Sequence, residues 1–230
     1  MWLGIPEIIA RFEQDATVRS IVVTGAGHEA FAAGADISEF DDHRATEDSA
    51  KSYDQATQAA TASIVRCAKP VIAAVRGICF GGGMALAMAC DLRLASDDAR
   101  FCIPAAKLGI GYGYEGTAAL VARLGPALAA EVLFTARIYT AHEALMNGII
   151  HALAPSADFD TLVTGYTAML AANAPLSIAA AKSVIRAIVS GSADERRAAE
   201  QRIAGCMTSE DYREGRTAFL EKRKPRFRGA

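Results

Sequence analysis

The chain has 230 residues, of which 52% are hydrophobic and 22% charged, so it can bury a substantial core and is not disordered in composition. Its 24 basic and 26 acidic residues nearly cancel, which argues against a surface that follows nucleic-acid phosphates. The uncharged apolar stretch at residues 78–90 is too short and too rich in glycine to span a membrane. Five cysteines without a Cys-x-x-Cys motif indicate buried thiols and a cytoplasmic location, and the first residues predict no signal peptide.

The first two thirds of the chain alternate short β-branched segments with longer segments of helical spacing. Apolar residues recur at steps of three and four from Trp2 to Gln14, which predicts an amphipathic helix. Strands are predicted at 20–24, 70–75, 91–95 and 148–153, and further helices at 51–66, 84–90 and 116–124. This alternation is typical of an α/β layered core.

The pattern becomes purely helical after Pro155. Helices are predicted at 159–173, 175–190, 193–205 and 209–222. Pro175 suits the first turn of a helix, and Gly191 suits the position just after a helix end. We therefore expect a core of residues 1–155 and a C-terminal helical region of residues 156–230.

A glycine-rich segment after the first predicted strand resembles a nucleotide-binding loop. Gly25-Ala-Gly27-His-Glu-Ala30 fits the loose G-x-G-x-x-A form of a dinucleotide-binding fingerprint. Such a loop must lead directly into a helix, whereas this chain continues with Phe31-Ala-Ala-Gly-Ala-Asp36. We interpret the segment as a plain turn.

Two common kinds of active site lack their sequence signatures. The chain has no G-x-S-x-G nucleophile elbow, which disfavours serine-based hydrolysis. Its four histidines show neither H-x-x-x-H nor mixed Cys/His spacing, so no metal site is predicted.

Three segments call for a functional explanation: residues 31–37, residues 69–87 and residues 101–117. The second contains Gly81-Gly82-Gly83 between a predicted strand and a predicted helix. Three consecutive glycines are entropically costly, and they suit a place where a backbone amide at a helix N-terminus approaches a ligand. A tight turn accounts for one or two of these glycines, so the third indicates a ligand.

The motifs F-x-A-G-A-D at 31–36 and K-P-V-I-A-A-V-x-G-x-x-x-G-G-G at 69–83, with the C-terminal segment 209–224, resemble the crotonase (enoyl-CoA hydratase/isomerase) superfamily. The resemblance covers nearly the whole chain. It implies an α/β crotonase-like spiral core of ββα units with a C-terminal helical oligomerisation region that forms homotrimers or hexamers. The family's fold begins with a strand pair, whereas the sequence as given starts at the helix that follows it.

The resemblance also implies the substrate, an acyl-CoA thioester, with coenzyme A as part of the substrate and no separate cofactor. Its carbonyl oxygen would lie between the backbone amides of Ala35 and Gly82, which stabilise an enolate. Removing one such donor typically costs about 2.7–4 kcal/mol in the transition state. The residues expected to contact the coenzyme A thioester are Ala33, Ala35, Asp36, Ile37, Gly82, Lys222 and Lys224.

The chain departs from the family pattern at the two catalytic glutamates. The matching positions hold Ala85 and Ala105, which cannot exchange protons, so we expect weak or no hydration of crotonyl-CoA. Related naphthoate synthases and methylmalonyl-CoA decarboxylases place an acid or a tyrosine at the position of Tyr112. Tyr112 therefore either binds an acyl carboxylate or shuttles a proton, or merely packs, and Glu115 is either a general acid or base or a cap for the helix that follows.

The basic tail has two interpretations. Lys222 and Lys224 belong either to a solvated helix end or to a coenzyme A phosphate contact. We favour partial participation in binding.

The sequence therefore predicts an enzyme of the enoyl-CoA hydratase/isomerase group. The first alternative is a methylmalonyl-CoA-type decarboxylase, which needs an oxyanion hole but no carboxylate pair. The second is a non-catalytic paralogue that binds coenzyme A or scaffolds an oligomer.

Overall fold

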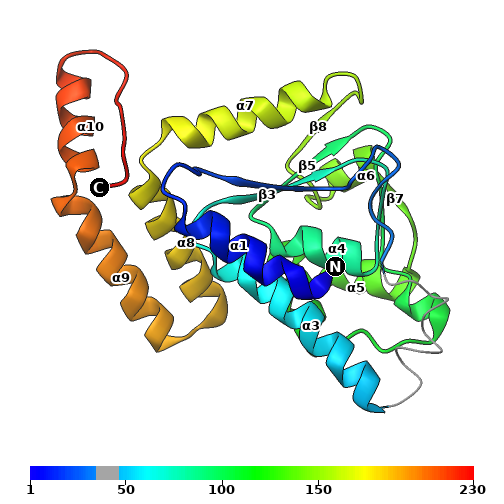
Figure 1. Ribbon diagram of the computed structural model, residues 1–230. Helices are drawn as coiled ribbons and strands as arrows, with labels where there is room; N and C mark the ends of the chain where they lie inside the picture. The colour runs from blue at the N-terminus through cyan, green and yellow to red at the C-terminus, as the bar shows by residue number, and fades with distance from the viewer. Residues whose placement is uncertain (35–46) are drawn as a thin grey trace. The chain divides into compact units, whose positions relative to one another are not determined.

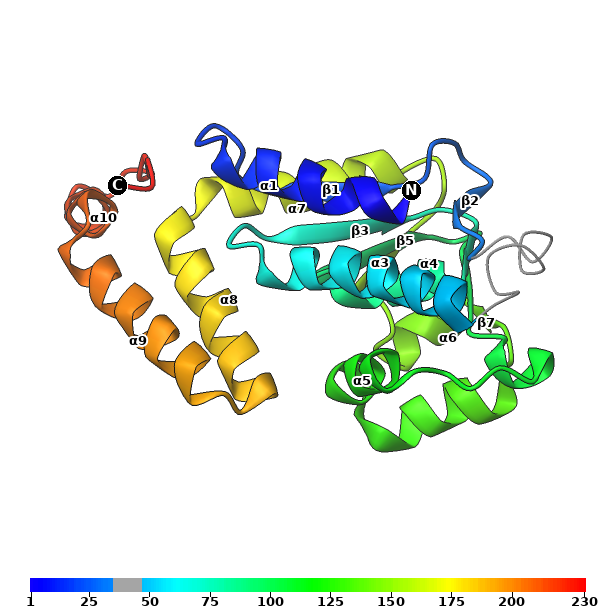
Figure 2. The ribbon, with the colours of Figure 1, turned by 60° about the horizontal axis from the view of Figure 1, so that its bottom comes forward.

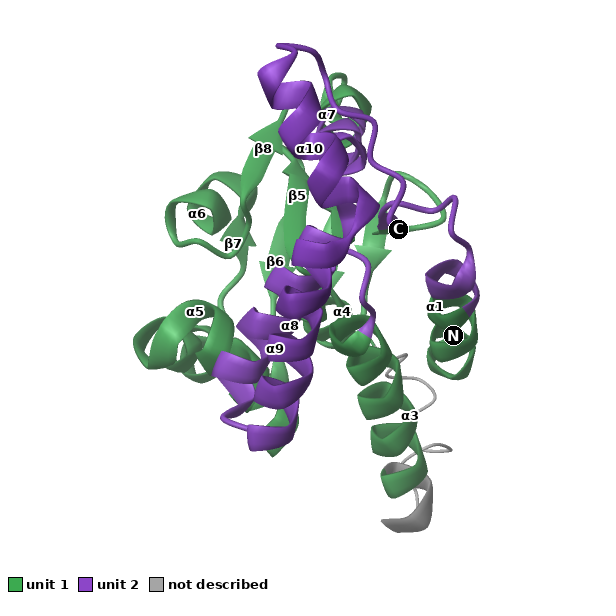
Figure 3. Ribbon diagram, turned by 90° about the vertical axis from the view of Figure 1, so that its left-hand side faces the viewer, with its two compact units in different colours: residues 1–10, 22–66, 71–163 green, residues 11–21, 67–70, 164–230 purple. Residues whose placement is uncertain are grey.

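The computed structural model describes residues 1–34 and 47–230, with side chains in the second stretch from residue 51 onward. It contains two compact units (Figure 3). Unit 1 comprises residues 1–10, 22–66 and 71–163, and unit 2 comprises residues 11–21, 67–70 and 164–230. The division expected at residue 155 stays a prediction.

Unit 1 is built around two four-stranded sheets. The first sheet has the order β1-β3-β5-β8, with β3 parallel to β5 and β5 parallel to β8. Its strands are Ile21–Thr24 (β1), Val71–Val75 (β3), Leu92–Ser96 (β5) and Ala152–Ala154 (β8). All five residues of β3 are buried, which fits a parallel strand covered on both faces.

The second sheet has the order β2-β4-β6-β7. Its strands are Ala30–Ala32 (β2), Ile78–Phe80 (β4), Arg100–Cys102 (β6) and Tyr139–Thr140 (β7). The pairs β2–β4 and β4–β6 are parallel, whereas β6–β7 is antiparallel. Sequence patterning missed this sheet, because strands of two or three residues carry too few positions for a period of two to be visible.

The two sheets are linked by a recurring order in which a strand of the first is followed by a strand of the second and then by a helix. The clearest example is β3, β4 and α4 (Gly82–Ala89). The predicted plain turn at 25–29 is confirmed, since it leads from β1 into strand β2 and not into a helix.

Helices complete unit 1. They are a 3₁₀ turn Trp2–Gly4, the first part of α1 (Ile5–Gln14), α3 (Glu47–Arg66), α4, a 3₁₀ turn Ala105–Leu108, α5 (Tyr114–Thr135), α6 (Ala141–Met146) and the start of α7 (Phe159–Ala172). Figure 2 shows α3 and α4 side by side.

Several boundaries differ from the sequence prediction, among them the helix predicted at 116–124, which extends from Tyr114 to Thr135. Helix α4 begins at Gly82, two residues early, because Gly82 and Gly83 form its first turn. The strand expected at 148–153 begins only at residue 152, because α6 ends at Met146 and Gly148, with a φ of +72°, lies in the turn that follows. The helix expected from residue 2 starts as a 3₁₀ turn.

One helix in the described part of the chain, α5, is long and apolar enough to cross a membrane by length and composition alone. It is interrupted at Gly125, whose φ of +75° and ψ of 164° are not helical, and Pro126 follows directly. Figure 2 shows its two halves at an angle.

Unit 2 is helical in its long C-terminal segment, as predicted. It contains the end of α7, then α8 (Pro175–Ser190), α9 (Ala193–Thr208) and α10 (Glu210–Leu220). Pro175 begins α8, and Gly191 ends it with a φ of +66°, so both predicted boundaries are confirmed. The tail then runs back along α10 (Figure 1), where the oxygen of Ala230 accepts hydrogen bonds from the first two amides of the helix.

Candidate functional site

The three segments singled out in the sequence meet at the N-terminus of α4, within unit 1. A Cβ added to Gly34 would lie 3.5 Å from the amide nitrogen of Gly82. The amide of Gly81 donates a hydrogen bond of 2.8 Å to the carbonyl of Cys102, and a Cβ on Gly81 would lie 4.0 Å from Pro104. The fold therefore gathers segments that are separated by up to 70 residues in the chain.

The N-terminus of α4 is an uncapped group of hydrogen-bond donors. No described residue accepts a hydrogen bond from the amides of Gly82, Gly83 or Met84, and the first amide bonded back into the helix is that of Ala85. The N-cap residue is Gly81, so no N-cap side chain accepts a hydrogen bond from this end, and no acidic residue lies in the first turn. The helix dipole adds partial positive charge here. Such an end can stabilise a carbonyl oxygen that gains negative charge.

The triple glycine has structural reasons at all three positions. Gly81 has a φ of +51°, which side chains rarely adopt. A Cβ on Gly82 would lie 2.9 Å from Cζ2 of Trp2, and a Cβ on Gly83 would lie 2.2 Å from the carbonyl oxygen of Ala32. The argument that the third glycine requires a ligand was therefore wrong, because backbone conformation and close packing account for all three.

The first predicted segment is only partly described. Ala33 is exposed directly after β2. Ala35, Asp36 and Ile37 lie outside the described residues.

The two alanines that the sequence resemblance places at the positions of the family's glutamates lie near this helix end. Ala85 is half-buried on α4, and Ala105 is buried at the start of the 3₁₀ turn that follows Pro104. Neither carries an ionisable group. The described part of the chain also contains no group of three His, Cys, Asp or Glu side chains placed to hold a metal ion.

Tyr112 and Glu115 flank the start of α5 in different environments. The Tyr112 ring is half-buried against the first turn of α5, since a Cβ on Gly116 would lie 2.7 Å from its Cε1. Burial raises the pKa of Tyr112 to about 12, so its hydroxyl stays protonated and can donate a hydrogen bond. Glu115 is exposed in the first turn of a helix that begins at Tyr114 and not at Gly116.

Sequence reasoning missed one pair at the site, Trp2 and Tyr53. The indole nitrogen of Trp2 donates a hydrogen bond of 3.1 Å to the hydroxyl of Tyr53 on α3. The Cζ2–Cη2 edge of the same indole faces Gly82. The patterning had treated Trp2 only as an apolar position of an amphipathic helix, although it is the only tryptophan in the sequence.

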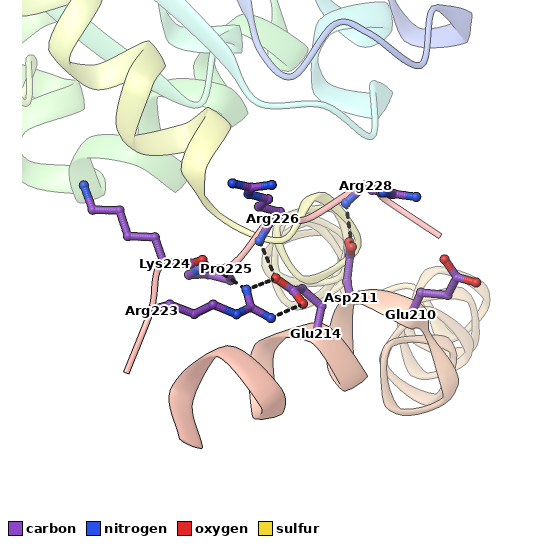
Figure 4. Close-up of a pocket in the computed structure, with 8 residues that line it drawn as sticks. All are labelled: Glu210, Asp211, Glu214, Arg223, Lys224, Pro225, Arg226 and Arg228. Carbon is purple, nitrogen blue, oxygen red and sulfur yellow. Dashed lines mark hydrogen bonds and ion pairs between the residues drawn. The ribbon is translucent and has the colours of Figure 1, made fainter. Parts of the chain in front are cut away.

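The basic tail lies in unit 2, beside an open hollow of about 850 Å³ (Figure 4). The hollow is lined by Glu210, Asp211, Glu214, Arg223, Lys224, Pro225, Arg226 and Arg228. Arg223 pairs with Glu214 at 2.6 Å, and the amide of Arg226 also donates a hydrogen bond to this carboxylate. Together, the two contacts lower the pKa of Glu214 to about 2. Figure 4 shows the exposed Lys224 side chain pointing away from that pair. Lys222 is also exposed, with a φ of +55°.

Comparison with known proteins identifies the family. The enoyl-CoA hydratase/isomerase family profile matches residues 5–230. The chain is 34% identical over 218 residues to a short-chain-enoyl-CoA hydratase of Clostridium acetobutylicum, covering 94% of this chain and 83% of that one. It is 35% identical over 228 residues to a carnitinyl-CoA dehydratase of Proteus mirabilis, covering 97% and 86% respectively.

Solved structures agree with these sequence relatives. A crystal structure described as an enoyl-CoA hydratase/carnithine racemase from Magnetospirillum magneticum matches with a TM-score of 0.94 at 34% identity, over 100% of this chain and 86% of that one. The expected crotonase-like α/β fold is thereby confirmed. The chain belongs to the enoyl-CoA hydratase/isomerase family of enzymes.

Proposed function

We propose that the protein binds an acyl-CoA thioester and stabilises its enolate between two backbone amides, those of Gly82 and Ala35. The observation that carries this proposal is the N-terminus of α4, where the Gly82 amide has no acceptor among the described residues and no side chain caps the helix. Gly34 lies against Gly82, and Ala35 follows it directly in the sequence. The names of two relatives, a short-chain-enoyl-CoA hydratase and a carnitinyl-CoA dehydratase, support the same substrate class.

The residues around this donor limit the chemistry. A hydratase needs groups that position water and exchange a proton, and Ala85 and Ala105 supply neither. We therefore expect slow hydration of crotonyl-CoA.

Decarboxylation of a malonyl-type thioester is the second candidate, favoured by Tyr112. In this reaction the bond between the α-carbon and its carboxylate breaks, carbon dioxide leaves, and the electron pair moves onto the thioester as an enolate. A proton then adds to the α-carbon. The protonated, half-buried Tyr112 suits a donor that orients the carboxylate. The exposed Glu115 is the alternative to Tyr112 as the source of the proton that adds to the α-carbon.

The remaining proposals concern context. We propose that coenzyme A enters as part of the substrate without a separate cofactor, with Lys222 or Lys224 near its phosphates. Exposed apolar residues on the helices of unit 2 support a homotrimer or hexamer: Ile185, Ile188, Val189, Ile203 and Met207. A cytoplasmic location fits the cysteine content.

A pair of variants at residue 82 tests the oxyanion role. Gly82→Ala keeps the amide N–H and adds a Cβ, whereas Gly82→Pro also adds the Cβ but removes the N–H. Because both variants crowd Trp2, the comparison controls for the added Cβ. We expect kcat for acyl-CoA turnover to fall about 10²–10³-fold further in Gly82→Pro than in Gly82→Ala. Equal activities in the two variants would refute the role of this amide.

The substrate is tested by offering the purified protein crotonyl-CoA and methylmalonyl-CoA in parallel. Release of carbon dioxide that depends on Tyr112 and is lost in Tyr112→Phe supports decarboxylation. Rapid hydration of crotonyl-CoA would show that other groups replace the missing glutamates. Tight binding of both without turnover would identify a non-catalytic paralogue.

A further inference from the structure

Trp2 is held in one orientation by contacts from two distant parts of unit 1. Its indole nitrogen donates to the Tyr53 hydroxyl at 3.1 Å, which joins the 3₁₀ turn Trp2–Gly4 to α3 across 51 positions of sequence. Both side chains are half-buried. A tryptophan has only two side-chain torsions, so this hydrogen bond and the surrounding packing leave the ring little freedom.

The Cζ2–Cη2 edge of the ring lies against the residue that supplies the oxyanion donor. A Cβ on Gly82 would meet Cζ2 of Trp2 at 2.9 Å and Cη2 at 3.5 Å. A carbonyl oxygen that accepts a hydrogen bond from the Gly82 amide would lie at most about 9 Å from Cζ2, by summing ordinary bond and hydrogen-bond lengths. The indole therefore lies within about 9 Å of the carbonyl oxygen of any thioester held there, close enough for the acyl chain to reach it.

This edge offers only carbon and hydrogen to a ligand. The one polar atom of the indole is engaged by Tyr53, so the surface next to Gly82 is flat and apolar. A wall of this kind suits the hydrocarbon part of an acyl group. It offers no hydrogen bond to a polar acyl group in exchange for those that the group makes with water.

We propose that Trp2, oriented by Tyr53, forms one wall of the acyl site and limits the size of the acyl group that the protein accepts. This inference rests on the proposed binding of an acyl-CoA thioester at Gly82. Trp2 is a specificity-determining residue and takes no part in proton transfer.

The experiment measures the affinity of butyryl-CoA and octanoyl-CoA, two saturated and unreactive thioesters, by calorimetry. Trp2→Ala removes the wall, so we expect the affinity for octanoyl-CoA relative to butyryl-CoA to rise at least about tenfold over the wild type, because each extra buried methylene favours binding. Leu3→Ala is the matched control, since Leu3 lies in the same turn with an 82% exposed side chain, and it should leave the ratio unchanged.

Fluorescence supplies a readout that needs neither turnover nor a substitution. Trp2 is the only tryptophan in the chain, so tryptophan emission reports this site alone. We expect butyryl-CoA to change the emission more than free coenzyme A does. Tyr53→Phe frees the indole nitrogen and should shift the emission of the unliganded protein.

The possible outcomes separate the two proposals. If neither thioester binds the wild type, the proposed function fails. If both bind but leave the emission of Trp2 unchanged, or if Trp2→Ala keeps the wild-type ratio, only the role of Trp2 is overturned. If Trp2→Ala does not fold, Trp2→Phe takes its place, because phenylalanine is a smaller wall. An unchanged ratio of octanoyl-CoA to butyryl-CoA affinity in Trp2→Phe, together with unchanged wild-type emission, would then overturn the role of Trp2.

Discussion

At the scale of single residues, the fold leaves little room around several of its glycines. A glycine can be required by its backbone conformation, by the lack of space for a Cβ, or by both. Gly77 has a φ of +56°, and a Cβ there would lie 1.9 Å from the carbonyl oxygen of Glu29. Gly109 has a similar φ of +67°, yet nothing lies within 4 Å of its Cβ position. The two positions therefore separate the strain of a left-handed backbone from true steric overlap.

We expect Gly109→Ala to lower the free energy of unfolding by about 1 kcal/mol, the cost of a left-handed residue with a side chain. We expect Gly77→Ala to lower it by about 3 kcal/mol or more, because the overlap is with backbone that cannot move without disturbing the adjoining strands β2 and β4. Urea denaturation of both variants checks this difference. Equal destabilisation would mean that the chain around Glu29 yields to the added methyl group.

At the scale of elements, the helices of unit 2 were the most predictable part of the molecule. Their long apolar spacing and their end signals, Pro175 and Gly191, are local properties that do not depend on neighbours. The fold of the tail onto α10 was not predictable, because it depends on contacts between the two segments, among them those of one buried carboxylate. Asp211 is 3% exposed and accepts hydrogen bonds from the amides of Arg228 and Gly229.

Asp211→Ala should therefore release the tail. Two amides lose their acceptor, which costs about 1–3 kcal/mol when they stay buried. Hydrogen–deuterium exchange should speed up at residues 226–230. Glu210→Ala is the control, because Glu210 is exposed and its ion pair with Arg213 is long at 4.0 Å. We expect this variant to change the free energy of unfolding by no more than about 0.5 kcal/mol. Unchanged exchange in Asp211→Ala would show that other contacts hold the tail.

At the scale of the whole molecule, a histidine beside a buried arginine leads to a prediction for stability in mild acid. Arg93 is 3% exposed and donates to the carbonyls of Ile149 and Cys90, and burial lowers its pKa to about 10. The backbone amide of Arg93 donates to Nδ1 of His151 at 3.1 Å. Burial, and then the charge of Arg93, lower the pKa of His151 below its ordinary value of 6.5.

The lowered pKa of His151 sets the direction of the pH dependence. The unfolded chain binds the histidine proton near pH 6.5, whereas the folded chain binds it only at lower pH. Its contribution to stability is therefore complete above pH 6.5 and is lost as the pH falls below that value. We expect His151→Gln to flatten the decline of the melting temperature below pH 6.5. Parallel curves for the variant and the wild type would contradict this.

The sequence by itself determined the family, the α/β class and the helical C-terminal region, since these depend on motifs, glycine and proline positions and apolar spacing along continuous segments. The short strands of the second sheet could not be predicted from the sequence, because their pairing depends on distant residues and not on local pattern. Only the tertiary structure placed Trp2 against Gly82 and tied it to Tyr53. Only the structure explained the three consecutive glycines, Gly81 by its backbone conformation and the other two by close packing. Contacts between residues 50 to 80 positions apart follow from how the elements pack in three dimensions, and such packing leaves no periodic trace in the chain.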